Sequence, residues 1–341
     1  MNVRDMIEMQ KQLMPDWIES MKKRYSILQH ILHAGTSGRR TLAASVGLTE
    51  RVLRAEIDFL KGQGLVDVYP YGMQLSISGR ELLDGMEPIL MDLFGLTELE
   101  ERVRKHFGLA QVVVVPGDSD VSPVAKKELG RAGSVALWKH ARQSDIIAVT
   151  GGSTMAEIAE QLVPSNRLRG ILFVPARGGL GENVELQANS IVSTMAKKTG
   201  GQYRLLHVPD RLSEDAYQSL MQEPHIRELL VEIGQSRIVL HGIGDAMTMA
   251  RRRKVEESEI RLLEAGGALG EAFGYYFDKH GTIVYKMPTV GLRIEDIQKT
   301  ETVIAVAGGR SKAEAIASVM RFGHEHVLVT DEAAASEMLI C

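Results

Sequence analysis

Apolar residues in the first part of the chain recur at the spacing of amphipathic helices. The first helix is expected from Asp16 to about His33, with an apolar face formed by Ile27, Leu28, Ile31 and Leu32. Two more helices are expected within residues 39–63, on either side of a sharp turn at Gly47. Thr49 can cap the second of them. This arrangement is typical of a helix-turn-helix.

Alternating apolar residues follow these helices and predict a β-hairpin. Val66 and Val68 belong to its first strand, and residues 69–72 form the turn. A hairpin directly after a helix-turn-helix is a wing. One further helix is expected from about Gly79 to Met86, because Pro88 lacks a backbone donor and disfavours helix continuation. We therefore predict a winged helix-turn-helix domain over residues 1–90.

Beyond residue 90 the pattern changes to short β-rich runs that alternate with helical periodicity. This alternation predicts a mainly parallel, doubly wound α/β sheet. Residues 91–341 are therefore expected to form a larger, Rossmann-like domain. The expected strands are 112–115, 146–150, 171–174, 204–208, 238–241, 282–285, 303–306 and 327–330.

Composition narrows the class of protein. The chain is 44% hydrophobic and 25% charged, and it has no apolar run near the roughly 20 residues that a membrane helix needs, so no membrane partner is expected. The first residues lack the apolar stretch of a secretory signal, which indicates a cytoplasmic protein. The single cysteine, Cys341, leaves no intrachain disulfide or cysteine cluster, and no metal site is expected.

Charge is unevenly distributed along the chain. The net charge is −4, yet residues 20–61 contain eight Lys or Arg and three Asp or Glu, a balance of +5. A basic stripe on a small domain is typical of a protein that binds nucleic-acid phosphates. A solvated helix surface is the alternative.

The second helix of the helix-turn-helix carries the best candidates for reading DNA. Arg51 and Arg54 point away from its apolar face, and arginine can bond guanine with two hydrogen bonds. Alternatively, Arg54 pairs with Glu50 or Asp58 on a solvated surface. Three helices, a wing and a basic stripe together favour DNA binding. The candidate DNA-binding residues are Arg39, Arg40, Thr41, Thr49, Arg51 and Arg54.

Two glycine-rich loops connect an expected strand to an expected helix. Residues 145–150 lead into Gly151-Gly152-Ser153-Thr154, where glycines, hydroxyls and a helix N-terminus suit an anion. The second loop, residues 307–312, places Lys312 in the first helical turn, where a cation opposes the helix dipole unless an anion is nearby. Taken alone, each loop could be a simple turn. Lys312 could likewise be a solvated side chain.

Three further loops carry polar residues that suit a sugar. Arg177 starts a loop through Gly181 that leads to Asn183 and Gln187, which are expected on one helical face. Of the four cations in 251–254, at most one is expected to turn inward. Glu271 could accept hydroxyl groups or cap a helix. Open α/β sheets bind ligands at the carboxyl ends of their strands, so the five loops together favour a ligand site.

Four motifs resemble the effector domain of the SorC family of sugar-responsive repressors: Thr150-Gly-Gly-Ser-Thr154, Val174-Pro-Ala-Arg-Gly-Gly179, Glu185-Leu-Gln-Ala-Asn189 and Ala307-Gly-Gly-Arg-Ser-Lys312. The resemblance covers nearly the whole chain. It implies a sugar-phosphate-isomerase-like sheet in a homo-oligomer, a dimer or tetramer. It also implies that the protein represses a glycolytic operon and leaves operator DNA when fructose 1,6-bisphosphate binds.

The resemblance also implies which residues bind this effector, with no cofactor involved. These are Gly151, Gly152, Ser153, Thr154, Arg177, Gln187, Arg252, Glu271 and Lys312. The choice of Arg252 over Arg251 and Arg253, and the choice of sugar, come from the resemblance alone. Two separate cationic groups, Lys312 and either Arg177 or Arg252, favour an effector with two phosphates. A singly phosphorylated sugar is the alternative.

An enzyme is the rival of another class, because glucosamine-phosphate deaminases and ribose-phosphate isomerases share the strand and glycine-loop arrangement. The deaminases follow a Gly-Ile-Gly turn with an aspartate, a glycine and a histidine that transfer protons. Here Gly242-Ile243-Gly244 is followed by Asp245-Ala246-Met247, which supplies no histidine. His241 lies on the strand side of the turn. We therefore expect no catalytic residues.

Overall fold

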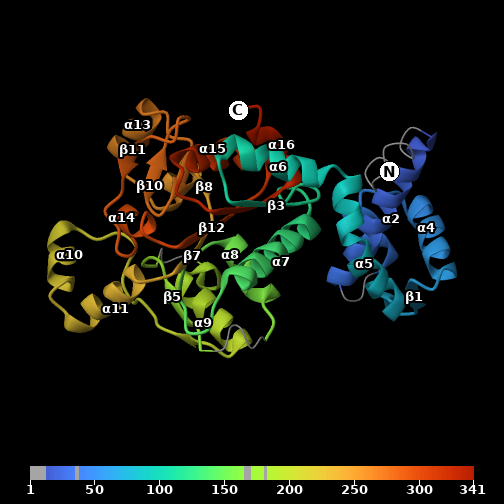
Figure 1. The fold of residues 1–341 in the computed structure, drawn as a ribbon, viewed down its shortest axis with the longest axis horizontal. Helices are drawn as coiled ribbons and strands as arrows, with labels where there is room; N and C mark the ends of the chain where they lie inside the picture. Colours follow the sequence, from blue (N-terminus) through green and yellow to red (C-terminus); the bar gives the residue numbers. More distant parts are fainter. Residues whose placement is uncertain (1–12, 35–37, 165–169, 180–182) are drawn as a thin grey trace. The chain divides into compact units, whose positions relative to one another are not determined.

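The structure is a computed structural model that describes residues 13–34, 38–164, 170–179 and 183–341. The chain divides into two compact units, Met1–Glu98 and Leu99–Cys341 (Figure 1). The boundary predicted at residue 90 falls within a helix of the first unit. Leu180 and Gly181 of the third predicted loop lie outside the described residues. Among those described, no helix is long and apolar enough to cross a membrane.

The first unit has the predicted winged helix-turn-helix order. Its elements are α2 (Pro15–Ala34), α3 (Arg39–Ser45), α4 (Glu50–Gly62), β1 (Val66–Tyr69), β2 (Gly72–Leu75) and α5 (Ile77–Leu93). The predicted apolar faces form its core, since Ile27, Ile31, Leu53, Ile57 and Leu60 are all buried. The Thr49 hydroxyl caps α4 by accepting the Val52 N–H at 3.3 Å. The strands pair antiparallel as a wing.

Helix α5 is longer than predicted and continues past Pro88 to Leu93. Its start is set by Ser76, whose Oγ accepts the Gly79 N–H at 2.9 Å. Leu90 and Leu93 are buried in a cluster with Trp17, Ile18 and Met21 of α2. We attribute the continuation to this burial, which offsets the hydrogen bond that the proline cannot donate.

A seven-stranded parallel sheet forms the centre of the second unit, in the order β3-β13-β12-β7-β4-β5-β6. Its strands are β3 (Gln111–Val115), β4 (Ile146–Val149), β5 (Leu172–Pro175), β6 (Gln202–Tyr203), β7 (Ile238–His241), β12 (Thr302–Val306) and β13 (Val327–Asp331). Six of the predicted strands are found here. The prediction of a strand at 204–208 is wrong, because only Gln202–Tyr203 pairs with β5.

Both faces of the parallel sheet are buried. Ile147, Leu240 and Ile304 face a cluster formed with α7, α8 and α9, and the alternate residues Ala148 and Val239 are equally buried. Burial on both faces is typical of a doubly wound sheet. The helices are α6 (Leu96–Phe107), α7 (Pro123–His140), α8 (Ser153–Gln161), α9 (Ala188–Thr199), α10 (Glu214–Leu220), α11 (Pro224–Gly234), α12 (Ala246–Arg252), α13 (Glu257–Ala265), α14 (Ile294–Ile297), α15 (Ala313–Phe322) and α16 (Glu332–Met338) (Figure 1).

A second, antiparallel sheet was not foreseen from the sequence. It has the order β11-β10-β9-β8, with β8 (Gly244–Asp245), β9 (Gly270–Ala272), β10 (Tyr275–Phe277) and β11 (Ile283–Lys286). The strand predicted at 282–285 therefore exists, but it belongs to this sheet. Glu271 lies on β9, so its loop does not follow a parallel strand as predicted.

The chain order creates a switch point in the parallel sheet. From β4 the chain proceeds outward to β5 and β6, whereas β7 lies on the other side of β4 and leads to β12 and β13. The loops after β4 and β7 therefore diverge at neighbouring strand ends. In open α/β sheets this is the position at which ligands bind.

Candidate functional site

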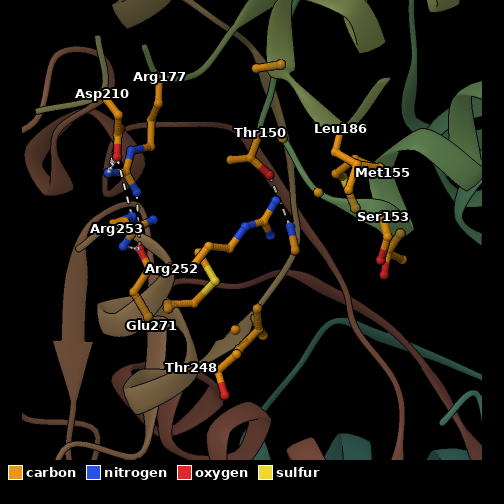
Figure 2. A pocket seen from close by; sticks show the side chains of 18 of the residues that line it. Thr150, Ser153, Met155, Arg177, Leu186, Asp210, Thr248, Arg252, Arg253 and Glu271 are labelled. Atoms are coloured by element: carbon orange, nitrogen blue, oxygen red, sulfur yellow. Dashed lines mark hydrogen bonds and ion pairs between the residues drawn. The ribbon is translucent and has the colours of Figure 1, made fainter. Parts of the chain in front are cut away.

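A pocket of about 380 Å³ opens at this switch point (Figure 2). This volume is within the usual range for a small-molecule site. The loops after β4 and β7 are joined at its base, because the Thr150 Oγ1 accepts the Gly242 N–H at 3.2 Å. All nine residues predicted to bind the effector line this one pocket. The structure thus brings together residues from five separate segments of the chain.

The first glycine loop presents the start of α8 to the pocket. Gly152 is the N-cap at φ 123°, a conformation that side chains rarely adopt, and Ser153 begins the helix. A Cβ on Gly151 would lie 2.7 Å from the Leu186 carbonyl oxygen, so only glycine fits there. The first N–H groups of a helix lack intrahelical acceptors. Together with the Ser153 and Thr154 hydroxyls, they can bind an anion.

The second glycine loop differs from its predicted role. The protein's own carboxylates accept its backbone N–H groups: Asp331 accepts Gly309 at 2.7 Å, Asp118 accepts Arg310 at 3.3 Å and Asp120 accepts Ser311 at 2.8 Å. This backbone is therefore occupied by internal anions. What the loop offers the pocket is the side chain of Lys312.

Lys312 lies at the N-cap of α15, at the end of the short helix η3 (Arg310–Lys312). Burial lowers the pKa of its ammonium group, while the nearby Asp120 carboxylate acts in the opposite direction. Among the described residues Lys312 has no carboxylate within 4.0 Å. A partly desolvated cation without an ion pair beside a helix N-terminus is a suitable partner for a phosphate.

The opposite wall of the pocket is a cluster of four buried charges, which we call the charge quartet: Arg177, Asp210, Arg253 and Glu271 (Figure 2). Arg177 contacts Asp210 at 2.8 Å and Glu271 at 3.1 Å. Arg253 contacts the same carboxylates at 3.3 and 2.9 Å. The neighbouring guanidinium groups hold the pKa of Glu271 below its usual value against the effect of burial.

Two of the four consecutive cations line the pocket, so the expectation of at most one is wrong. Arg252 extends into the pocket from α12, and Arg253 joins the charge quartet (Figure 2). Both lie at the C-terminal end of α12, where Arg252 is the last helical residue and Arg253 is the C-cap. No pattern in the sequence distinguishes the two, because a run of cations has no internal periodicity.

The third predicted loop, which starts at Arg177, also differs from its prediction. Asn183 and Gln187 do not share a helical face, because only a short 3₁₀ helix, η2 (Val184–Leu186), separates them. The Asn183 Oδ1 caps η2 by accepting the Glu185 N–H at 3.0 Å. Gln187 lines the pocket at the start of α9, and a Cβ on Gly179 would lie 2.8 Å from its Oε1. Gly179 therefore makes room for the Gln187 amide.

His241 is buried beneath the pocket and does not line it. Its ring packs on Phe273, with centroids 4.4 Å apart, and its Nε2 lies 3.8 Å from the Glu325 carboxylate. Burial lowers the pKa of His241 to about 4. A histidine kept neutral and away from the ligand space does not fit the role of a general acid.

The candidate DNA-binding residues lie on the outer surface of α3 and α4. Arg39, Arg40, Thr41, Arg51 and Arg54 are all exposed. Arg54 has no ion pair with Glu50 or Asp58 among the described contacts, so the alternative of a paired arginine finds no support. Their exposure leaves these groups available to a polyanion.

Part of the basic stripe is already neutralised within the first unit. Glu56 of α4 is buried and contacts Lys23 at 2.6 Å and Arg24 at 2.8 Å. Arg24 also lies 3.8 Å from the centre of the Phe59 ring. These two cations therefore stabilise the packing of α2 on α4.

Comparison with known proteins gives consistent matches over the full chain. Residues 20–90 match the CggR N-terminal DNA binding domain, and residues 91–340 match a family described as a sugar-binding domain. The chain is 50% identical over 339 residues to the central glycolytic genes regulator of Priestia megaterium, with 99% of each chain covered. It is 46% identical over 334 residues to the regulator of the same name from Bacillus subtilis, with 98% of each covered.

A solved structure supports the same assignment. A SorC family transcriptional regulator from Enterococcus faecalis shares 43% sequence identity at a TM-score of 0.67, covering 71% of this chain and 99% of that one. These relatives are regulators, so the prediction of a regulator and not an enzyme is confirmed. With a DNA-binding domain at its N-terminus and a sugar-binding domain after it, this chain belongs to the SorC family of sugar-binding transcriptional regulators.

Proposed function

We propose that this protein represses a glycolytic operon in the cytoplasm and leaves its operator when fructose 1,6-bisphosphate binds the pocket. The match of 50% identity to a central glycolytic genes regulator over 99% of both chains carries the first half of this proposal. The second half is supported by the pocket. It combines a helix N-terminus, two hydroxyls, Lys312 and Arg252 with polar groups that suit sugar hydroxyls.

A bisphosphate needs two anion-binding places. The start of α8 and Lys312 supply one, and Arg252 supplies a cation for the other. Arg177 is a weaker candidate for a phosphate than the sequence suggested, because Asp210 and Glu271 already balance its charge. No cofactor is needed for this function, because binding alone shifts the equilibrium between two states of the regulator.

Regulation further requires that the effector bind the DNA-free state more tightly than the DNA-bound state. We propose that the functional form is a homo-oligomer, a dimer or a tetramer. Winged helix-turn-helix proteins commonly read two half-sites with two copies, and the oligomer would supply them. Analytical ultracentrifugation measures the oligomer size directly.

The test combines DNA and sugar binding on the purified full-length protein. Fluorescence anisotropy with duplexes from upstream of glycolytic genes should show tight binding to one site, with affinity falling steeply as salt rises. Fructose 1,6-bisphosphate should release that duplex. A fragment of residues 91–341 should keep sugar binding and lose DNA binding. If no hexose or triose phosphate changes the affinity for the duplex, the proposal of a sugar-phosphate effector is refuted.

A further inference from the structure

We propose that Arg253 and Asp210 are positioning residues of the ligand site, and that the charge quartet forms a neutral wall that selects sugar hydroxyls over phosphate. This inference rests on the proposed function of the pocket. Neither residue was singled out from the sequence. Both lie in the pocket wall beside Arg177 and Glu271, whose orientation they fix (Figure 2).

The contacts within the quartet alternate in sign. Each carboxylate contacts both guanidinium groups, at distances between 2.8 and 3.3 Å. The Glu271 Oε1 also accepts the Gly274 N–H at 2.6 Å, which ties it to the turn after β9. Arg253 further contacts the Tyr276 hydroxyl at 3.3 Å. No member can rotate without breaking two contacts.

Burial increases the energetic importance of these contacts. The four side chains are only 5–7% exposed, so each charge depends on the others for compensation. Without Arg253, two carboxylates would share a single guanidinium group, leaving one negative charge uncompensated in a dry site. Arg177 would then turn toward one of the two carboxylates and lose its contact with the other. The planar fork of arginine can bridge both carboxylates, which a lysine at this position could not do.

The cluster also has hydrogen-bonding capacity that the protein leaves unused. Among the described residues, nothing accepts a hydrogen bond from Arg177 Nε, and Arg253 Nε lies 3.3 Å from Asp210 Oδ2 without the geometry of a hydrogen bond, although both side chains are more than nine-tenths buried. Buried donors without an acceptor are rare in folded proteins. A ligand oxygen close to either Nε would supply the missing acceptor.

The charge balance decides which ligand group belongs there. Two arginines and two carboxylates sum to zero, so a phosphate at this wall would meet Asp210 and Glu271 without net attraction. Sugar hydroxyls both donate and accept, and they suit alternating carboxylates and guanidinium groups. The two phosphates are instead expected away from this wall, one where α8 begins and Lys312 has no ion pair, and the other at Arg252. The wall therefore sets the orientation of the sugar.

The experiment compares a charge-balanced variant with wild type. The double variant Asp210→Asn/Arg253→Met keeps Arg177 paired with Glu271, so it should fold where Arg253→Met alone could fail. Arg253→Lys tests the need for the guanidinium fork. Arg251→Ala, at the exposed neighbour, is the matched control. Calorimetry with fructose 1,6-bisphosphate measures the sugar contacts, and a thermal-shift titration with inorganic phosphate measures the anion site alone.

We expect the double variant and Arg253→Lys to lose about tenfold or more in affinity for the sugar phosphate, the effect of about one hydrogen bond. Their response to inorganic phosphate should stay that of wild type, and Arg251→Ala should change neither. Equal sugar affinity in all variants overturns the positioning role. A parallel loss of inorganic phosphate binding overturns it too, because that result indicates general collapse of the pocket. If wild type binds neither probe, the proposed function itself is refuted.

Discussion

The Asp120 Oδ2 accepts a hydrogen bond of 2.8 Å from the backbone N–H of Ser311. A carboxylate of the protein thus lies where the sequence suggested a ligand phosphate, immediately beside Lys312. Asp120 is exposed, unlike the fully buried Asp331 that holds Gly309 in the same loop. We expect an exposed negative charge beside Lys312 to repel an incoming phosphate.

Neutralising this charge should strengthen effector binding. Asp120→Asn retains an acceptor for the Ser311 N–H and removes only the charge. A like charge a few ångströms from a phosphate near the surface is worth on the order of 1 kcal/mol, so affinity should rise about threefold to tenfold. Calorimetry with fructose 1,6-bisphosphate at low salt measures this change in affinity. Asp215→Asn on α10 is the control, and a weaker or unchanged affinity in Asp120→Asn would refute the repulsion.

Lys312→Ala should weaken phosphate binding. A charge-assisted hydrogen bond contributes about 1.5–3 kcal/mol, so fructose 1,6-bisphosphate should bind at least about tenfold less tightly. Fructose 6-phosphate and fructose 1-phosphate should bind less tightly than the bisphosphate to wild type. Lys299→Ala, an exposed lysine after α14, serves as the control. Equal affinity of wild type for monophosphate and bisphosphate would contradict two anion places.

Arg54→Ala should reduce binding to the cognate operator by about 1–3 kcal/mol if its guanidinium group reads a guanine. Its affinity for unrelated duplexes should change little. Anisotropy titrations over a range of salt concentrations distinguish an arginine that reads a base from one that contacts a DNA phosphate. A uniform loss across sequences, with a shallower dependence on salt, would mean that Arg54 contacts only a phosphate.

The buried pair of His241 and Glu325 should make stability depend on pH. Burial raises the pKa of Glu325 to about 8 and lowers that of His241 to about 4. Above the ordinary histidine pKa, about 6.5, Glu325 is the one member of this pair whose protonation differs between the folded and unfolded chains. The folded state holds the extra proton, so the free energy of unfolding should fall by about 2 kcal/mol as pH rises from about 6.5 to 8.

Below that window the two groups act in opposite directions. Between about pH 4.5 and 6.5 the unfolded histidine gains a proton that the folded one does not, which offsets the effect of Glu325. Urea unfolding of wild type and Glu325→Gln at several pH values measures the free energy of unfolding in both pH ranges. The variant should lose the decline above pH 6.5 and should lose stability as the solution is acidified from pH 6.5. An unchanged decline in the variant would assign it to other groups.

Local patterns were enough to predict the winged helix-turn-helix and six of the seven strands of the parallel sheet. The winged helix-turn-helix follows from the apolar spacing in residues 16–63 and from the alternation at Val66 and Val68. Residues that face the core recur with a different period in a helix than in a strand, so the two patterns can be told apart. The glycine loops followed from strand-to-helix transitions. The strand at 204–208 and the helix end before Pro88 were wrong, because pairing partners and burial override local preference.

Tertiary structure alone decided how the charges combine. The sequence determined that Arg177 and Lys312 follow strands of the parallel sheet in glycine-rich segments suited to a ligand, since residue type and a strand-to-helix transition are local properties. It could not show that Asp210 and Arg253 complete a neutral quartet, or that Asp118 and Asp120 occupy the backbone of the second glycine loop. These contacts join residues far apart in sequence, and only the packing of two sheets and their loops sets the distances on which electrostatic energy depends.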